Sequence, residues 1–284
     1  MDITRVGILG SGIMGSGIAE VVAGAGAEVI LRSRSQSSAA EMLAVLDASL
    51  ERQVKKEKRT REDADALRSR VTTTTDLDDL ADCDLIIESV VESMPVKRDV
   101  FVELDGIVKP EAIFATNTST LSVLELASVT SRPEQVCGLH FFNPAPAMSL
   151  VEVIRPFSAS DETIETVIRF AIACGKDPVV VTDSAGFIVN ALLFPYLNDA
   201  IRLYEEGVAT KEGIDTAMKG GCGFPMGPFA LLDLVGLDTS LAILDALHAA
   251  FPNEKYEARP TLRDLVASGH LGRKSGAGFF DYTK

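Results

Sequence analysis

Val6-Gly7-Ile8-Leu9-Gly10-Ser11-Gly12-Ile13-Met14-Gly15 is the stretch of this chain that decides its fold. The apolar run before Gly10 predicts a buried strand over residues 4–9, and apolar residues at helical spacing predict a helix over residues 13–25. Between them, Gly10 permits a tight turn, Gly12 lets the backbone approach a pyrophosphate, and Gly15 lets the helix pack close to the strand. A glycine-rich turn can also close an ordinary loop, but its place between a strand and a helix favours dinucleotide binding. The residues expected to contact the dinucleotide here are Gly10, Ser11, Gly12, Ile13, Met14 and Gly15.

The next strand, expected at residues 28–31, is followed by Arg32-Ser33-Arg34 and not by an acidic residue. A carboxylate about 20 residues after the glycines usually binds the ribose 2′-hydroxyl of NAD. A 2′-phosphate would be repelled by an Asp, whereas a guanidinium group and a Ser hydroxyl suit it. We therefore predict that Arg32, Ser33 and Arg34 favour NADP. The alternative is that both arginines are solvated loop residues and that NAD binds without the acid.

Composition limits the class of protein and its partners. The chain has 284 residues, of which 46% are hydrophobic, enough for two domains with sizeable cores. Its formal net charge of −14 argues against nucleic acid and anionic membranes as partners. No apolar run is long enough to cross a bilayer, and the early first strand leaves no room for a signal peptide. Four widely spaced cysteines indicate buried thiols and no metal site. Together these features favour a cytoplasmic location.

Strand and helix signals alternate as far as residue 182, and the repeated strand–helix–strand order predicts an α/β fold. Such an order implies a mostly parallel sheet with helices on both faces. The expected strands are residues 4–9, 28–31, 71–74, 84–91, 112–115, 136–142, 150–154 and 178–182. The expected helices of this region are residues 13–25, 37–69, 95–108, 121–128 and 161–173.

After Asp183-Ser184-Ala185-Gly186 the pattern changes, and strand signals give way to helical ones. We place a domain boundary near residue 184, with a dinucleotide-binding domain at 1–184 and an all-helical domain at 185–284. The first helix of the second domain is apolar around much of its girth, which fits either a buried central helix or a subunit interface. The helices expected here are residues 187–206, 210–219, 227–249 and 260–268.

His140 and Glu152 are the candidate acid–base pair. His140 ends one apolar strand, Glu152 lies within the next, and a short Pro-rich turn joins the two strands, so the residues could be cross-strand neighbours. A carboxylate on one imidazole nitrogen fixes the tautomer and leaves the other nitrogen as a base. An enzyme that oxidises a hydroxyl needs such a base, because the proton must leave as hydride goes to nicotinamide. The alternative is a hydrogen-bonded core histidine.

Three other groups of polar residues are candidates for binding. Asn117-Thr118-Ser119-Thr120 follows a strand, where ligands bind in open α/β sheets, although these residues could equally cap a helix over residues 121–128. Glu92 and Lys97 could bond a nicotinamide ribose, but the sequence alone favours a surface pair. A basic stripe could clamp a phosphorylated ligand such as coenzyme A or be an ordinary solvated face. This stripe consists of Arg52, Lys55, Lys56 and Arg59.

Over essentially its whole length the chain resembles the L-3-hydroxyacyl-CoA dehydrogenase family, and most closely its short bacterial members, the 3-hydroxybutyryl-CoA dehydrogenases. His140-Phe-Phe-Asn-Pro144 and Met226-Gly-Pro228, the latter followed by Gly236-Leu-Asp238, are more specific signals than the glycine turn. The other matching strings are GSGIMGSGIA, ESVVE followed by Lys97, NTSTLS, VEVI, DSAGFIVNALLFPYLNDAI and GRKSGAGFFDY.

The resemblance implies a Rossmann-like domain, a helical domain that forms a homodimer interface, and an active site in the cleft between them. It implies that His140 is the catalytic base, that Glu152 orients it, and that Ser119 and Asn190 bond the substrate near its 3-oxygen and thioester. Glu92, Lys97, Asn117, Ser119 and Lys274 are then expected to bind the dinucleotide, and Ser49, Lys56 and Ser119 the acyl-CoA. One position departs from the family pattern: the resemblance implies an Asp in NAD-using members where this chain has Ser33.

The predicted reaction is the reversible oxidation of a short L-3-hydroxyacyl-CoA to the 3-oxoacyl-CoA with NADP, or with NAD as the second choice. One alternative is the same chemistry on an acyl-carrier-protein thioester, since both carriers end in phosphopantetheine. Another is a dinucleotide-binding protein without turnover, which the four catalytic candidates His140, Glu152, Ser119 and Asn190 argue against.

Overall fold

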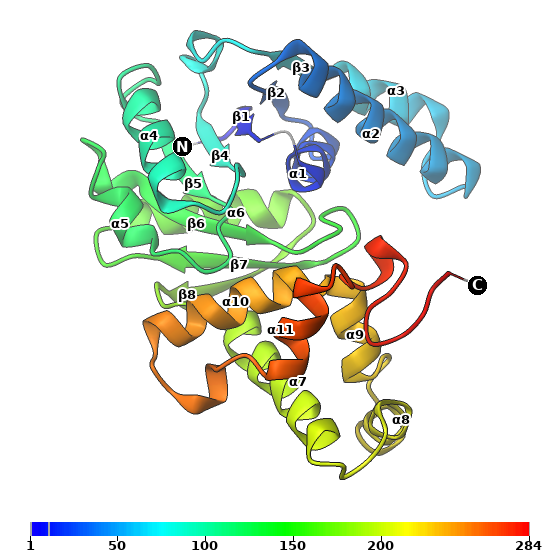
Figure 1. Cartoon of the computed structure of the whole chain (residues 1–284). Helices are drawn as coiled ribbons and strands as arrows, with labels where there is room; N and C mark the ends of the chain where they lie inside the picture. The colour runs from blue at the N-terminus through cyan, green and yellow to red at the C-terminus, as the bar shows by residue number, and fades with distance from the viewer. Residues whose placement is uncertain (1, 11, 284) are drawn as a thin grey trace. The chain divides into compact units, whose positions relative to one another are not determined.

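The computed structural model describes residues 2–10 and 12–283, and the chain divides into two compact units, Met1–Asp183 and Ser184–Lys284. The first unit contains an eight-stranded sheet of order β3-β2-β1-β4-β5-β6-β7-β8, and the second is built from helices (Figure 1). All neighbouring strands are parallel except β6 and β7. The predicted mostly parallel sheet followed by a helical domain is thereby confirmed. The strands are β1 Arg5–Leu9, β2 Glu28–Arg32, β3 Val71–Thr74, β4 Leu85–Glu88, β5 Ile113–Thr116, β6 Val136–Phe141, β7 Leu150–Arg155 and β8 Asp177–Thr182.

Helices cover both faces of the sheet, as expected. Successive side chains of a strand point to opposite faces, so neighbouring residues of one strand pack against different helices. Ala115 of β5 belongs to a core that includes residues of α1, α2, α3 and α6. Its neighbour Phe114 points the other way and meets Phe101 of α4 edge to face, with ring centroids 5.7 Å apart. The helices of this unit are α1 Ile13–Gly24, α2 Gln36–Lys55, α3 Arg61–Ser69, α4 Met94–Asp105, α5 Val123–Ala127 and α6 Asp161–Ala173.

Most predicted elements of the first unit differ from the observed ones by one to three residues at an end, and two of the differences have a clear local cause. The single helix predicted over 37–69 is wrong, because Glu57 adopts a left-handed conformation (φ 55°) and Thr60 caps α3 by accepting a hydrogen bond from the Asp63 N–H. The strand predicted over 84–91 ends at Glu88, whose own carboxylate accepts a hydrogen bond from the Val90 N–H at 2.7 Å. This bond turns the chain away from the sheet.

The second unit packs α8, α9, α10 and α11 against α7, so α7 is its central helix. The one helix predicted over 227–249 is wrong: Gly236, at φ 103°, ends α9 and caps α10. A side chain at Gly236 would place its Cβ 3.1 Å from Asp238 Oδ1 and 3.3 Å from Lys274 Nζ. Within the described residues, no helix combines the length and apolarity that a bilayer span requires. These helices are α7 Val189–Glu205, α8 Lys211–Cys222, α9 Pro228–Val235, α10 Leu237–Ala250 and α11 Pro260–Ala267.

Candidate active site

His140 and Glu152 form a buried hydrogen-bonded pair on adjacent strands. The antiparallel register places His140 of β6 directly opposite Glu152 of β7, and Nδ1 of His140 lies 2.7 Å from Oε2 of Glu152. The two residues are 5% and 0% exposed. Because a carboxylate oxygen only accepts, Nδ1 carries the hydrogen and Nε2 presents its lone pair. The ring of Phe142 packs against the imidazole, with centroids 4.6 Å apart.

Ser119 is the third member of this hydrogen-bonded line. It follows β5 in the loop before α5, and its Oγ lies 3.2 Å from Nε2 of His140. Ser119 and His140 therefore meet at the carboxyl ends of β5 and β6, the edge at which open α/β sheets bind ligands. A hydroxyl and an imidazole nitrogen at this distance can share one substrate oxygen, one as hydrogen-bond donor and the other as proton acceptor.

Asn117 joins the ends of three strands. Its Oδ1 accepts from the Phe141 N–H at 2.8 Å, and its Nδ2 donates to Ser89 Oγ at 3.2 Å. Both ends of the amide are thus bonded within the protein, although a contact with the dinucleotide was expected for this residue. The alternative reading of residues 117–120 as the cap of α5 is wrong, since Ser122 caps that helix and accepts from the Glu125 N–H.

Lys97 is fully buried, which rules out the surface pair that the sequence alone favours. It is 1% exposed, and its Nζ lies 2.7 Å from Glu88 Oε1 and 3.4 Å from Glu92 Oε2. Glu88 is 0% exposed and did not emerge from the sequence as a site residue. The one signal for it was a carboxylate at the end of the otherwise apolar run Leu85-Ile-Ile-Glu88.

The glycine turn has the geometry that a pyrophosphate needs. Gly10 has a φ of 127°, and a Cβ there would lie 2.1 Å from the carbonyl oxygen of Ser89. A Cβ on Gly15 would lie 2.3 Å from the carbonyl oxygen of Gly10, whereas a Cβ on Gly12 would meet no atom of the described residues beyond its chain neighbours within 4 Å. A ligand can therefore reach the backbone at Gly12 and the start of α1. Ser11 falls outside the described residues, and Ile13 and Met14 form the first turn of α1.

The three residues expected to choose the cofactor line a cavity of about 340 Å³ beside this turn. Ser33 is 2% exposed, and among the described residues its Oγ has no hydrogen-bond partner. The buried Nε of Arg32 lacks a partner in the same way, while Arg34 is exposed. Unpaired buried polar atoms are uncommon and mark a place where a ligand can supply the missing bond. The cavity is lined by Gly10, Gly12, Arg32, Ser33, Arg34, Ser89, Val90, Val91, Val96 and Val100.

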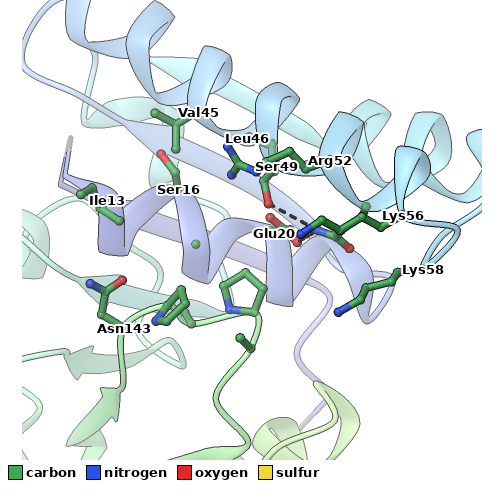
Figure 2. Close-up of a pocket in the computed structure, with 16 residues that line it drawn as sticks. Ile13, Ser16, Glu20, Val45, Leu46, Ser49, Arg52, Lys56, Lys58 and Asn143 are labelled. Atoms are coloured by element: carbon green, nitrogen blue, oxygen red, sulfur yellow. Dashed lines mark hydrogen bonds between the residues drawn. The ribbon is translucent and has the colours of Figure 1, made fainter. Parts of the chain in front are cut away.

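A second cavity, of about 490 Å³, lies between α1, α2 and the Pro-rich turn at 143–147 (Figure 2). Ser49 and Lys56, the expected coenzyme A contacts, both line it, together with the cations of Arg52 and Lys58. On one wall the Nε2 of Gln53 donates to Glu20 and, at 3.3 Å, to Ser49 Oγ. Part of the basic stripe therefore faces a cavity and is not simply a solvated surface.

The second unit holds the two remaining predicted site residues. Asn190 lies in the first turn of α7 and is 7% exposed. Lys274 is exposed, and its Nζ lies 2.6 Å from the carboxylate of Asp238. Asp233 anchors the tail that carries Lys274, because it accepts hydrogen bonds from the N–H groups of Phe279 and Phe280 at 2.8 Å. Burial raises the pKa of Asp233.

Family models cover both units. The model described as "3-hydroxyacyl-CoA dehydrogenase, NAD binding domain" matches residues 5–184, and the model described as "3-hydroxyacyl-CoA dehydrogenase, C-terminal domain" matches residues 186–282. The chain belongs to the 3-hydroxyacyl-CoA dehydrogenase family. It is therefore an oxidoreductase, and its first unit is a domain for a nicotinamide dinucleotide.

Individual relatives agree with this assignment over the full chain. A 3-hydroxybutyryl-CoA dehydrogenase of Clostridioides difficile is 48% identical and covers 99% of this chain and 100% of its own length. The human mitochondrial hydroxyacyl-coenzyme A dehydrogenase is 43% identical, covering 99% of this chain and 91% of its own. The crystal structure of an (S)-3-hydroxybutyryl-CoA dehydrogenase from Ralstonia eutropha is 42% identical and covers 100% of both chains with a TM-score of 0.96.

Proposed function

We propose that the enzyme interconverts short L-3-hydroxyacyl-CoA thioesters, such as 3-hydroxybutyryl-CoA, and the corresponding 3-oxoacyl-CoA. The observation that carries this proposal is the hydrogen-bonded line Glu152–His140–Ser119 at the carboxyl ends of β5 and β6. It supplies a proton acceptor, a group that orients it and a hydroxyl beside it. A secondary alcohol needs these three in order to lose a proton while it loses a hydride.

Each residue then has a distinct task in the oxidative direction. A bound nicotinamide would supply the hydride acceptor that oxidation at C3 of the substrate requires. His140 Nε2 accepts the hydroxyl proton, and the carboxylate of Glu152 stabilises the imidazolium that results. Ser119 and Asn190 donate hydrogen bonds to the substrate near its 3-oxygen and thioester. In the reductive direction His140 returns its proton to the 3-oxygen.

The test is a spectrophotometric assay of acetoacetyl-CoA reduction, with acetoacetyl-acyl-carrier protein as a second substrate. The expected result is turnover of the coenzyme A thioester with a much lower kcat/KM for the carrier-protein thioester. A faster reaction on the carrier protein would favour the alternative substrate. Absence of turnover with either substrate, in a wild-type protein that binds the dinucleotide, would support the non-catalytic alternative and overturn the proposal.

We further propose that the enzyme prefers NADP to NAD. The support is local: β2 ends without a carboxylate, and Ser33 Oγ and Arg32 Nε are buried with no partner among the described residues. A 2′-phosphate has oxygen acceptors for both groups and for the guanidinium of Arg34, whereas a 2′-hydroxyl offers much less charge. An Asp at position 33 would reverse this preference by repelling the phosphate.

The cofactor proposal is tested with kcat/KM for NADPH and NADH, in the wild type and in Arg34→Ala. Loss of a charge-assisted hydrogen bond should lower kcat/KM for NADPH roughly tenfold to a hundredfold and leave NADH almost unchanged. A matched control is Arg61→Ala, which removes an exposed guanidinium paired with Glu51 in α2. Ser33→Asp combined with Arg34→Ile should favour NADH. Equal kcat/KM for the two cofactors in the wild type would contradict the proposal.

We also propose that the larger cavity binds the phosphate-bearing end of coenzyme A through Lys56 and Ser49. Arg52, Lys56 and Lys58 bring positive charge to this cavity in a chain of net charge −14. Lys56→Ala should raise KM for acetoacetyl-CoA about threefold to tenfold. It should not raise KM for acetoacetyl-N-acetylcysteamine, which lacks the phosphates. An equal rise for both thioesters would contradict a phosphate contact.

Finally, we propose that the second unit forms a homodimer. It exposes several large apolar side chains, among them Leu192 at 71% and Val208 at 65%. Exposed apolar side chains in such number can mark a surface that another protein chain covers. Sedimentation equilibrium should give a dimer for the wild type and a monomer, or a weaker dimer, for Leu192→Asp. A monomeric wild type would overturn this proposal and leave the catalytic one intact.

A further inference from the structure

Buried charge lies next to the catalytic line without being part of it. Glu88 ends β4, and its carboxylate accepts three hydrogen bonds of 2.7 Å each. The donors are the Lys97 ammonium, the Val90 N–H and the Thr116 hydroxyl. Removing a lysine and a glutamate from water is costly unless further hydrogen bonds satisfy them, and here those bonds come from the turn after β4 and from the end of β5.

Two chains of hydrogen bonds run from this ion pair to the loop that carries Ser119. In the first, Thr116 Oγ1 donates to Glu88 and accepts from the Thr118 N–H at 3.2 Å. In the second, Glu92, 3.4 Å from the Lys97 ammonium, accepts from the Ser119 N–H at 2.9 Å and from Thr118 Oγ1 at 2.6 Å. Both chains end within one residue of Ser119.

We propose that Glu88 is a positioning residue for Ser119, acting through Lys97 and Thr116. This inference rests on the proposed function, because it concerns how the Ser119 hydroxyl is held 3.2 Å from His140 Nε2. Ser119 lies in a loop, and loops fix a side chain less well than strands or helices do. A displacement of about 1 Å is enough to weaken catalysis severely. The buried ion pair gives this loop a rigid attachment to β4.

The same geometry explains why Lys97 and Glu88 are both required. Glu88 alone would be an unpaired buried carboxylate, and Lys97 alone an unpaired buried ammonium, so neither could hold its neighbours in place. Thr116 is 0% exposed and links the pair to the loop through one hydroxyl group. It is the point at which the first of the two chains can be cut without leaving a buried charge unpaired, while the chain through Glu92 stays intact.

The experiment compares Thr116→Val, which removes that hydroxyl at nearly constant volume, with Thr116→Ser, which keeps it. Thr116→Val should lower kcat about fivefold to tenfold, with KM for the coenzyme A thioester nearly unchanged, and Thr116→Ser should restore most of the loss. A matched control is Thr163→Val in α6, where a threonine 4% exposed donates to the Glu134 carbonyl oxygen and lies outside both chains. It should affect thermal stability only.

A double-mutant cycle separates positioning from general destabilisation. In a Ser119→Ala background there is no hydroxyl to position, so Thr116→Val should cost less than twofold in kcat. Glu88→Gln should behave in the same way if it folds. If it does not fold, the comparison of Thr116→Val with Thr116→Ser still tests the proposal, because both variants keep the ion pair of Glu88 and Lys97.

A measurement without turnover completes the test. The ¹⁵N resonance of His140 Nε2 should shift in Thr116→Val towards its value in Ser119→Ala and stay near the wild-type value in Thr116→Ser and Thr163→Val. If the wild type is active and Thr116→Val changes neither this resonance nor kcat, the positioning role is wrong and the proposed function stands. A wild type without activity overturns the proposed function and this inference with it.

Discussion

The two ends of β4 each carry a carboxylate–lysine pair, fully buried at the carboxyl end and partly exposed at the amino end, and the two pairs have different consequences. At the amino end, Asp84 accepts from Lys109 at 2.5 Å and from the Thr4 and Arg5 N–H groups at 2.8 and 2.9 Å. At the carboxyl end, Glu88 binds Lys97, the Val90 N–H and Thr116. Both carboxylates pair with one lysine and hold backbone groups.

What differs is where each network leads. The Asp84 bonds fix the start of β1 and the chain after α4, whereas the Glu88 bonds continue to the loop of Ser119 and from there to His140. Ligands bind at the carboxyl ends of parallel strands, so a charge placed at that end can serve a site. A charge of the same kind at the amino end can serve only stability.

The largest effect is expected at the catalytic histidine, to which the network at the carboxyl end of β4 leads. His140→Ala removes the proton acceptor and should lower kcat about 10³-fold to 10⁴-fold. Thermal stability should fall as well, because the buried carboxylate of Glu152 loses its imidazole donor. Stopped-flow and steady-state assays of acetoacetyl-CoA reduction measure the loss. A matched control is His270→Ala, an exposed histidine of the second unit, which should retain activity. An active His140→Ala variant would remove the distinction between the two ends.

A smaller effect is expected at the amino end, and on stability alone. Burial by itself would raise the pKa of Asp84, but the hydrogen bonds from Lys109, Thr4 and Arg5 outweigh it and lower the pKa to about 2. Since this pKa lies below that of an unfolded aspartate, the ionised carboxylate stabilises the fold above about pH 4, and the gain is lost as the pH falls towards 2. Asp84→Asn should therefore cost about 2 kcal/mol at pH 7.

Urea unfolding at several pH values measures this difference, which should narrow below pH 4 and leave kcat at pH 7 unchanged. Lys109→Met should give a similar loss at pH 7, because it removes the same ion pair from the other side. A fall in kcat in Asp84→Asn, with the protein still folded, would show that both ends of β4 serve the site.

Much of the candidate active site could be predicted from the sequence. The glycine turn, with its strand and helix, is local in the chain, and the residues that need special backbone geometry are glycines themselves. His140 and Glu152 interrupt apolar strands joined by a short turn, so the alternation of strands and turns indicated that they could meet. In these cases the information lies within a few residues.

The Glu88–Lys97 pair could not be predicted in the same way. A lysine four residues into a helix is usually solvent-exposed, and only the turn after β4 brings its ammonium to Glu88. The break after α2 was hidden because Glu57 adopts positive φ without being a glycine. Gly236 was visible, but its apolar neighbours on both sides continue a helical pattern. Periodicity reports which face is buried and not where a helix ends.

The smallest expected effect concerns the coupling between the two ends. Asp84 and Glu88 are four steps apart along the strand, so at about 3.3 Å per residue they lie roughly 13 Å apart, and among the described residues Asp84 and Thr116 share no hydrogen-bond partner. Asp84→Asn and Thr116→Val should therefore add in unfolding free energy to within about 0.5 kcal/mol. The contrasting pair, Glu88→Gln with Thr116→Val, shares a hydrogen bond and should deviate from additivity by more than that. Urea unfolding of the single and double variants gives both terms. Strong coupling between Asp84 and Thr116 would mean that β4 transmits strain from one end to the other. The hydrogen-bond networks at its two ends would then not be energetically independent.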